Sequence, residues 1–259
     1  MKDSHESPFF SIVTACFNSS ETINDTIQSV ASQSFQNYEH IFIDGLSTDN
    51  SLEIIHDSPS QKQKIFSEKD EGIYDAMNKG IQAARGKWIL ILNSDDYFAD
   101  HNVLNNIYLA IKNNSNVSII YSNLKYVQKK SLKTIRIWNS KTFYTNAFLD
   151  GFVPPHPTFV VKKEIYQNFG KFDLVYKYAA DFEIMFRFLE TYQINSFYLD
   201  YLSVCMRTGG ETNKSIKNIF KGNLEIIKIL TNHYSKLPLS FYFKRFVKKL
   251  TQFKAGLGK

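Results

Sequence analysis

The first third of the chain alternates between short apolar runs and segments in which apolar residues recur at three- and four-residue spacing. The runs have the length of buried strands, and the spacing between them is that of amphipathic helices. Strands and helices that alternate in this way form βαβ units, with helices on both faces of a mainly parallel sheet. We therefore predict an α/β fold. The predicted strands are residues 9–15, 40–43, 64–67 and 88–92, and the predicted helices are residues 23–31, 52–55 and 73–84.

The rest of the chain has a more mixed order of elements and no internal repeat. We expect one large domain over residues 1–210 and a helical extension over residues 211–259. Residues 140–157 lack a regular period and contain three prolines. They predict a long loop, and a loop of this length in a compact domain is often functional. The predicted strands are residues 118–122, 125–128 and 134–138, which antiparallel pairing would suit, and 197–206; the predicted helices are residues 102–113, 181–192, 215–230 and 239–253.

Carboxylates follow three of the predicted strands. They are Asp44 after the second strand, Glu68 and Asp70 after the third, and Asp95 and Asp96 after the fourth. Polar residues at a strand end can simply form a solvated turn. However, the carboxyl ends of parallel strands meet at one edge of a sheet, where ligands bind. Three groups of carboxylates at that edge would repel one another without a cation or a hydrogen-bonding ligand. The pattern therefore favours a ligand site over three independent turns.

Composition excludes several classes of protein. The net charge of +6 lies in residues 241–259, which hold six basic and no acidic side chains, so the remainder is neutral and a nucleic-acid partner is not expected. No apolar stretch has the length of a membrane span, and the polar start does not resemble a signal peptide. Cys16 and Cys205 match no metal or redox spacing, which fits buried thiols in a reducing compartment. We therefore expect a cytoplasmic protein.

Several ordered motifs over roughly residues 9–210 resemble glycosyltransferase family 2, whose members adopt the GT-A fold. The first motif is SIVTACFNSSETINDTIQSVASQSFQNYEHIFIDGLSTDNS. The most specific is SEKDEGIYDAMNKGIQAARGKWILILNSDD, which resembles enzymes of bacterial surface-polysaccharide assembly, of the colanic acid, capsule or O-antigen type. PHPTFVVKKEIYQNFGKFD and AADFEIMFR resemble the acceptor-side block. The resemblance implies a nucleotide-sugar half over about residues 9–100 and an acceptor half over about 101–210.

The resemblance implies a donor site for a nucleotide sugar, a UDP-sugar first and a GDP-sugar next, with Mn²⁺ or Mg²⁺ on its diphosphate. The expected metal ligands are Asp95 and Asp96, because hard cations take carboxylate oxygens and substrate phosphates. Two departures stand out: Gly45 replaces the second Asp of the family's Asp-Asp-Gly-Ser pattern, and Asn93 replaces the first Asp of the DXD motif. The expected donor contacts are Thr14, Ala15, Asp44, Asp70, Asn93, Ser94 and Asp95.

For the acceptor, the resemblance places the general base at Asp181, and transfer in one step would invert the anomeric centre. An Asp at that point is also a common helix N-cap, and both roles are compatible. His156 lies in the proline-rich loop, where a contact to the acceptor or the metal competes with a structural role. Arg207 could approach the diphosphate from a mobile loop or belong to a surface turn. The acceptor itself would be a hydroxyl of a glycan or of a lipid-linked molecule.

Residues 241–254 have the pattern of a basic amphipathic helix, with aromatic and aliphatic residues on one side and lysine and arginine on the other. Such a helix can lie on an anionic membrane surface, which would make the protein peripheral on the inner face of the plasma membrane. It can equally pack on the domain or in an oligomer, and the sequence leaves these readings open.

Two rival functions stay open beside the transfer of a hexosyl or N-acetylhexosaminyl group. A sugar-nucleotide pyrophosphorylase would share an α/β sheet but would need a Gly- and Arg-rich loop, which Ala15-Cys16-Phe17-Asn18 does not provide. A catalytically degenerate domain would bind a nucleotide sugar without turnover. The departures at Asn93 and at Ala180, where the family often has Glu, keep that alternative alive.

Overall fold

In a computed structural model of the chain, the described residues are 7–58, 60, 62–209, 216–234, 236–238 and 241. The strands are β1 (Phe10–Cys16), β2 (Tyr38–Asp44), β3 (Gln63–Ser67), β4 (Trp88–Ile91), β5 (Tyr97–Phe98), β6 (Ile119–Val127), β7 (Thr134–Trp138), β8 (Val160–Lys162) and β9 (Ser196–Arg207). The helices are α1 (Ile23–Ala31), α2 (Ser51–His56), α3 (Ile73–Ala83), α4 (Val103–Asn113), α5 (Lys163–Phe169), α6 (Ala180–Phe186) and α7 (Ile216–His233), with a 3₁₀ turn η1 (His156–Thr158) and a π turn η2 (Arg187–Thr191).

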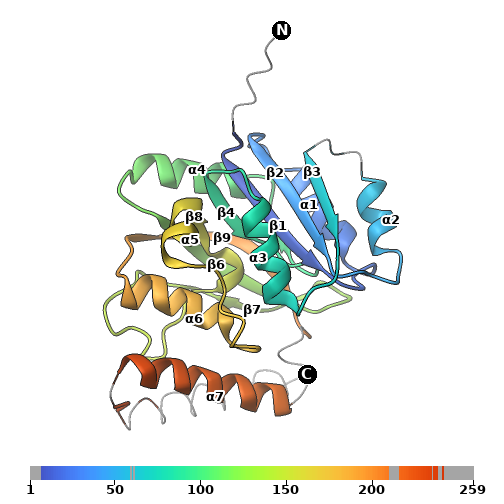
Figure 1. Cartoon of the computed structure of the whole chain (residues 1–259). Helices are drawn as coiled ribbons and strands as arrows, with labels where there is room; N and C mark the ends of the chain where they lie inside the picture. Colours follow the sequence, from blue (N-terminus) through green and yellow to red (C-terminus); the bar gives the residue numbers. More distant parts are fainter. Residues whose placement is uncertain are drawn as a thin grey trace.

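Within the described residues, nine strands form one mixed sheet in the order β3-β2-β1-β4-β8-β6-β9-β5, with β7 paired to β6. The first four strands of the chain pair with one another in parallel: β1 pairs with β2 and β4, and β2 pairs with β3. β6 and β9 are also parallel, whereas β5, β7 and β8 run antiparallel to their partners. Helices lie on both faces of this sheet (Figure 1). The predicted α/β class is confirmed.

The sheet is apolar on both faces because helices cover both. Adjacent residues of a strand point to opposite faces. Along β1, Ile12 joins the apolar cluster that includes Leu104 and Ile107 of α4, whereas Val13 joins the cluster that includes Met77 of α3. A strand buried on both faces has no polar alternation, which is why β1 and β4 are almost continuously apolar in sequence.

Several elements differ from the sequence prediction. The predicted strands 118–122 and 125–128 are one strand, β6, which is parallel to β9 and antiparallel to β7 and β8. The strands β5 and β8 and helix α5 were not predicted, because two to seven residues are too few to show a period. The predicted helix 181–192 is α6 followed by the π turn η2.

Within the described residues of the carboxy-terminal extension, the predicted helix 215–230 is α7, which packs beside α6 (Figure 1). Ile229 and Leu230 of α7 are buried in the same apolar cluster as Phe186 of α6. In the part of the chain that the structure describes, no helix is long and apolar enough to cross a membrane. The predicted basic helix over residues 239–253 lies outside the described residues, apart from Phe241.

Helix α3 crosses β1 so closely that glycine is required at position 80. A Cβ atom on Gly80 would lie 2.1 Å from Cγ1 of Val13. We expect Gly80→Ala to lower the free energy of unfolding by about 1–3 kcal/mol through overpacking, despite the better helix propensity of alanine. Urea unfolding measures the effect. The matched control is Gly222→Ala in α7, where the nearest atom to a new Cβ is 3.4 Å away and no loss is expected. Equal losses in both variants would contradict the proposed contact.

Candidate active site

The first part of the site lies where β2 and β3 end. Asp44 is completely buried, and its carboxylate accepts hydrogen bonds from the Ser47 amide and hydroxyl and from the Ser67 hydroxyl. Asp70 lies against Gly45, since a Cβ on Gly45 would lie 2.5 Å from Oδ2 of Asp70. Gly45 stands where the family pattern has its second Asp, and the Asp70 carboxylate occupies the space that a side chain at position 45 would need. Asp44 shapes this loop, and Asp70 offers the accessible carboxylate.

The end of β1 contributes less than expected through its side chains. Thr14 is completely buried, and its hydroxyl lies 2.9 Å from Nε2 of His40. Burial lowers the pKa of His40 to about 3, so this ring is neutral and the pair is structural. Ala15 is 5% exposed and belongs to the apolar cluster under α3. A contact of Thr14 or Ala15 with a donor would therefore use their backbone, and the expectation that they line the donor pocket stays a prediction. Phe17, in the loop after β1, is 61% exposed and lies beside Gly45.

The loop from Asn93 to Asp96 is fixed by the helix that follows β1. The Thr26 hydroxyl of α1 donates to the backbone carbonyls of Ser94 and Asp96, at 3.1 and 2.7 Å. The Ser94 hydroxyl lies 2.8 Å from the hydroxyl of Ser19. These contacts join the loop after β4 to the loop after β1, so the two predicted donor segments do meet at one edge of the sheet.

Asp95 and Asp96 are adjacent but have different environments. Asp96 is completely buried, and its carboxylate accepts hydrogen bonds from the Arg207 amide and the Asn93 side-chain amide. The Asp95 carboxylate is half-buried, and the hydrogen bond that Arg207 donates to this residue goes to its backbone carbonyl. Burial raises the pKa of Asp96 well above its usual range, with the negative charge of Asp95 as the next cause. Of the two predicted metal ligands, only Asp95 presents an accessible carboxylate.

The donor atoms near Asp95 fit a hard divalent cation. Burial raises the pKa of Asp95 against the opposing charges of Arg207, Lys129 and His156, so an ionised carboxylate is costly here unless a cation neutralises it. The side-chain oxygen of Asn93 is buried and lacks a hydrogen-bond partner in the described chain. In the same described ranges, no group of three or more His, Cys, Asp or Glu side chains could hold a metal. The protein thus supplies an incomplete set of oxygen ligands, which suits a cation that a diphosphate completes.

Arg207 is neither on a mobile loop nor in a surface turn, which corrects both sequence-based readings. It is the last residue of β9 and is 3% exposed. Its guanidinium pairs with the carboxylate of Asp25, donates to the backbone carbonyl of Asp95 at 2.7 Å and lies over the ring of Tyr97. Arg207 therefore holds the Asp95 loop from the buried side, and it contributes positive charge although its side chain is not exposed.

The second part of the site joins His156 and Asp181, which are 25 positions apart in the sequence. Nδ1 of His156 lies 3.4 Å from Oδ2 of Asp181, and both side chains are about a third exposed. Oδ1 of Asp181 accepts hydrogen bonds from the Tyr74 hydroxyl at 3.2 Å and from the Phe182 amide at 2.8 Å. Burial, and then the Asp181 charge, raise the pKa of Tyr74 well above its usual range, so Tyr74 is a stable donor. The structure thus brings together His156 and Asp181, the two residues that were predicted for the acceptor side.

Asp181 is not the N-cap of its helix. Helix α6 begins at Ala180, and Ala179 is the N-cap, without a side-chain cap. Instead, the carboxylate of Glu225 in α7 accepts hydrogen bonds from the amides of Lys177, Tyr178 and Ala179, at 2.8–3.0 Å. A carboxylate from α7 thus holds the backbone that leads into α6. The Asp181 carboxylate accepts from one first-turn amide, that of Phe182, through Oδ1, and its Oδ2 lies near His156.

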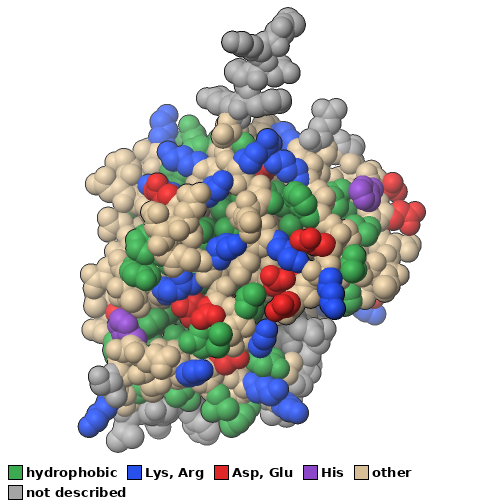
Figure 2. Space-filling model, in the orientation of Figure 1, with side chains coloured by type: hydrophobic (Ala, Val, Ile, Leu, Met, Phe, Trp, Pro, Cys, Tyr) green, Lys and Arg blue, Asp and Glu red, His purple; other side chains and the backbone are tan. Residues whose placement is uncertain are grey.

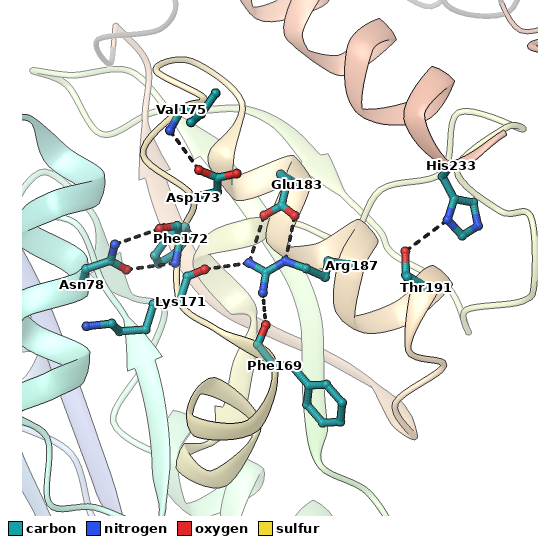
Figure 3. A network of polar contacts seen from close by, with 10 residues as sticks. All are labelled: Asn78, Phe169, Lys171, Phe172, Asp173, Val175, Glu183, Arg187, Thr191 and His233. Carbon is teal, nitrogen blue, oxygen red and sulfur yellow. Dashed lines mark hydrogen bonds and ion pairs between the residues drawn. The ribbon is translucent and has the colours of Figure 1, made fainter. Parts of the chain in front are cut away.

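A polar network fixes α6 relative to α3 (Figure 3). The Asn78 side chain exchanges two hydrogen bonds of 2.9 Å with the backbone of Phe172. Arg187 forms a two-point ion pair with Glu183 and donates to the carbonyls of Phe169 and Lys171. The segment that leads to Asp181 is therefore held between the helix that carries Tyr74 and the helix that carries Asp181.

Glu68 belongs to the surface and not to the site. Its carboxylate pairs with Lys79 at 3.4 Å, and Asp75 pairs with the same lysine at 3.5 Å. Figure 2 shows acidic and basic side chains mixed on the face that α3 covers. One of the three carboxylate groups predicted for the strand edge is thus partly a solvated turn.

A cavity of about 280 Å³ opens beside Asp181 and His156. Its other walls come from β7, the loop before η1, α6 and α7. We call it the acceptor cavity, after the acceptor role that the family resemblance implies for Asp181 and His156. Its apolar lining includes Trp138, Val153, Phe182, Met185, Ile219 and Ile226.

Sequence reasoning did not find four residues of this site. Phe17 lies in the loop after β1, and Trp138 is the last residue of β7, a strand predicted from its pattern alone. Tyr74 faces Asp181 from a helix whose pattern suggested only packing. Glu225 lies in the extension that we had separated from the catalytic domain. Tyr74 lies 107 positions from Asp181, and no local pattern signals a contact over that distance.

Comparison with known sequences gives a consistent result. The model of the family described as glycosyl transferase family 2 matches residues 11–169, more than half of the chain. An uncharacterised glycosyltransferase of Mycobacterium tuberculosis is 30% identical over 182 residues, which are 70% of this chain and 68% of that protein. A PGL/p-HBAD biosynthesis glycosyltransferase of Mycobacterium bovis is 24% identical over 183 residues, which are 70% of this chain and 69% of that protein.

Solved structures share the fold. TarS 1–349 of S. aureus, in complex with UDP-GlcNAc, has a TM-score of 0.68 at 19% identity, over 91% of this chain and 69% of that chain. The mannosyltransferase PcManGT of Pyrobaculum calidifontis, in complex with GDP-Man and Mn²⁺, has a TM-score of 0.63 at 13% identity, over 90% of this chain and 67% of that chain. The sheet is thus of the GT-A type, and with the match of the family model over residues 11–169 the chain belongs to glycosyl transferase family 2 and is a glycosyltransferase.

Proposed function

We propose that the protein transfers a sugar, with inversion, from a nucleotide-sugar donor to a hydroxyl of a glycan or a lipid-linked acceptor in bacterial polysaccharide biosynthesis. A UDP-sugar is the first choice of donor and a GDP-sugar the second. The observation that carries the proposal is the pairing of Asp181 with His156 and Tyr74 at the mouth of the acceptor cavity. The complexes of TarS with UDP-GlcNAc and of PcManGT with GDP-Man support the class of donor.

The donor side uses residues that the structure keeps accessible. The exposed ring of Phe17 and the carboxylate of Asp70 flank Gly45, and together they can stack on a base and accept a hydrogen bond from its N–H or from a ribose hydroxyl. The carboxylate of Asp95 and the side-chain oxygen of Asn93 would hold Mn²⁺ or Mg²⁺. When bound, that cation stabilises the negative charge that develops on the leaving diphosphate.

The acceptor side supplies a base. Asp181 would take the proton of the acceptor hydroxyl as its oxygen attacks the anomeric carbon from the side opposite the leaving diphosphate, which inverts the configuration. Hydrogen bonds from Tyr74 and from the Phe182 amide hold one carboxylate oxygen, so that the other, near His156, faces the acceptor. His156 would orient the hydroxyl and add no redox or covalent step.

Calorimetry with UDP, GDP and uridine tests the donor half of the proposal. We expect UDP to bind at least tenfold more tightly with Mn²⁺ or Mg²⁺ than in EDTA, because the cation links Asp95 to the diphosphate. Uridine lacks a diphosphate and should bind weakly and equally with and without metal, which makes it the matched control. UDP that binds equally well in EDTA would contradict the metal-dependent mechanism.

A further inference from the structure

We infer that the acceptor cavity binds an apolar group about one ring in size, attached to or next to the hydroxyl that is glycosylated. This rests on the proposed function and adds the chemical class of the acceptor. His156 and Asp181 form a polar part of the lining, Asn223 of α7 adds an amide, and most of the other lining side chains are aromatic or aliphatic. A hydroxyl at the polar part formed by His156 and Asp181 therefore places whatever carries it against an apolar wall.

The size of the cavity limits its occupant. A dry apolar cavity of about 150 Å³ accepts benzene. A cavity of about 280 Å³ with an open mouth thus accommodates one substituted ring or a short alkyl segment. Trp138 stacks on Tyr126 with ring centroids 6.2 Å apart and an interplanar angle of 8°, so the aromatic wall is already in place without a ligand.

Helix α7 forms a fixed side of this cavity. Its residues Ile219, Gly222 and Ile226 line the space together with Trp138 and Met185. Three hydrogen bonds from the backbone before α6 to Glu225 attach α7 to the helix that carries Asp181. The extension is therefore part of the acceptor site, and the distance between the base and the apolar wall is set by these bonds.

Tryptophan fluorescence of the full chain reports occupancy. The chain has two tryptophans, and Trp88 is completely buried, so a ligand in the cavity should change the emission of Trp138. In the presence of UDP and Mn²⁺, we expect phenyl β-D-glucoside to bind about 10- to 100-fold more tightly than methyl β-D-glucoside, as the burial of one ring predicts.

A titration with phenol alone shows whether the apolar group carries the acceptor hydroxyl itself or is attached to a sugar that carries it. Binding of phenol supports a hydroxyl carried directly on the apolar group, and binding of the phenyl glycoside alone supports a sugar with an apolar aglycone.

Gly222→Leu fills the cavity without harming the helix. A new Cβ would meet its nearest atom at 3.4 Å, and leucine is a better helix former than glycine. We expect this variant to lose the preference for the phenyl glycoside and to keep its melting temperature. Lys228→Leu is the control, because it adds the same side chain on the exposed face of α7.

Equal binding of phenyl and methyl glycosides by the wild-type protein, no fluorescence response to any apolar probe, or an unchanged preference in Gly222→Leu would overturn the inference. UDP binding is measured on the same samples. If UDP with Mn²⁺ binds and the apolar probes do not, only this inference fails. If the probes bind and UDP does not, the proposed function fails while the apolar site stands.

Discussion

Asp181→Asn is expected to lower the rate of sugar transfer by about 10²–10⁴-fold and to leave the affinity for UDP unchanged. In the proposed mechanism the carboxylate acts on the acceptor, and it lines the acceptor cavity, which does not include the Asp95 loop. The asparagine oxygen can still accept the hydrogen bonds from Tyr74 and the Phe182 amide. Because Ala179 is the N-cap, the substitution removes no cap, and the melting temperature should be nearly unchanged. Transfer rate, calorimetry and thermal unfolding measure the three quantities.

Tyr74→Phe is the matched control for Asp181→Asn. It removes the hydroxyl that holds Oδ1 of Asp181 but leaves the carboxylate and its contact to His156. We expect a smaller loss of rate than for Asp181→Asn, because the base is still present but less well oriented.

A transfer rate close to normal in Asp181→Asn would show that another group is the base. His156 would then be tested first, because Glu183 is already paired with Arg187.

The parallel half of the sheet could be predicted because its signals are local. The strands β1, β2 and β4 are continuous apolar runs, and α1 and α3 have clear apolar faces, since helices cover both faces of this part. The position of carboxylates at the strand ends then follows from parallel topology alone. That reasoning placed Asp44, Asp70 and Asp95 at one edge, which is where the structure has them.

The acceptor half could not be predicted in the same way because its contacts are distant in sequence. β8 has three residues and lies antiparallel between β4 and β6, so no period marks it. The pairing of His156 with Asp181 depends on α6, and Glu225 of α7 holds the backbone before α6 from 46 to 48 positions away. Burial also depends on the whole fold, and this is why the sequence could not separate the accessible Asp95 from the buried Asp96.

The difference between these two carboxylates leads to a prediction for Asp95→Asn. We expect it to weaken metal-dependent UDP binding by about 10–100-fold or more, because an amide is a poorer ligand than a carboxylate and adds no charge. Uridine binding, which does not involve the metal, should be unchanged. Asp57→Asn removes one negative charge from an exposed position and is the control for net charge. Calorimetry with Mn²⁺ measures all three.

The same substitution should stabilise the metal-free protein at neutral pH. Burial raises the folded-state pKa of Asp95, so the folded protein binds this proton more tightly than the unfolded chain does. The stability gained from that proton is complete below the unfolded-state pKa and is lost as the pH rises through the folded-state pKa. At neutral pH in EDTA the ionised Asp95 therefore destabilises the fold, and Asp95→Asn should melt at a higher temperature than the wild-type protein.

The advantage of Asp95→Asn should depend on pH and on metal in a defined direction. It should shrink as the pH falls toward the folded-state pKa of Asp95, because the wild-type carboxyl then binds its proton and becomes neutral as well. Saturating Mn²⁺ with UDP should reverse it, since ligand binding stabilises only the protein that retains the site. Thermal unfolding from neutral to mildly acidic pH, in EDTA and with Mn²⁺ and UDP, tests both statements. A lower melting temperature for Asp95→Asn in EDTA at neutral pH would mean that Asp95 stabilises the fold through protein contacts, and the cation assignment would lose its electrostatic basis.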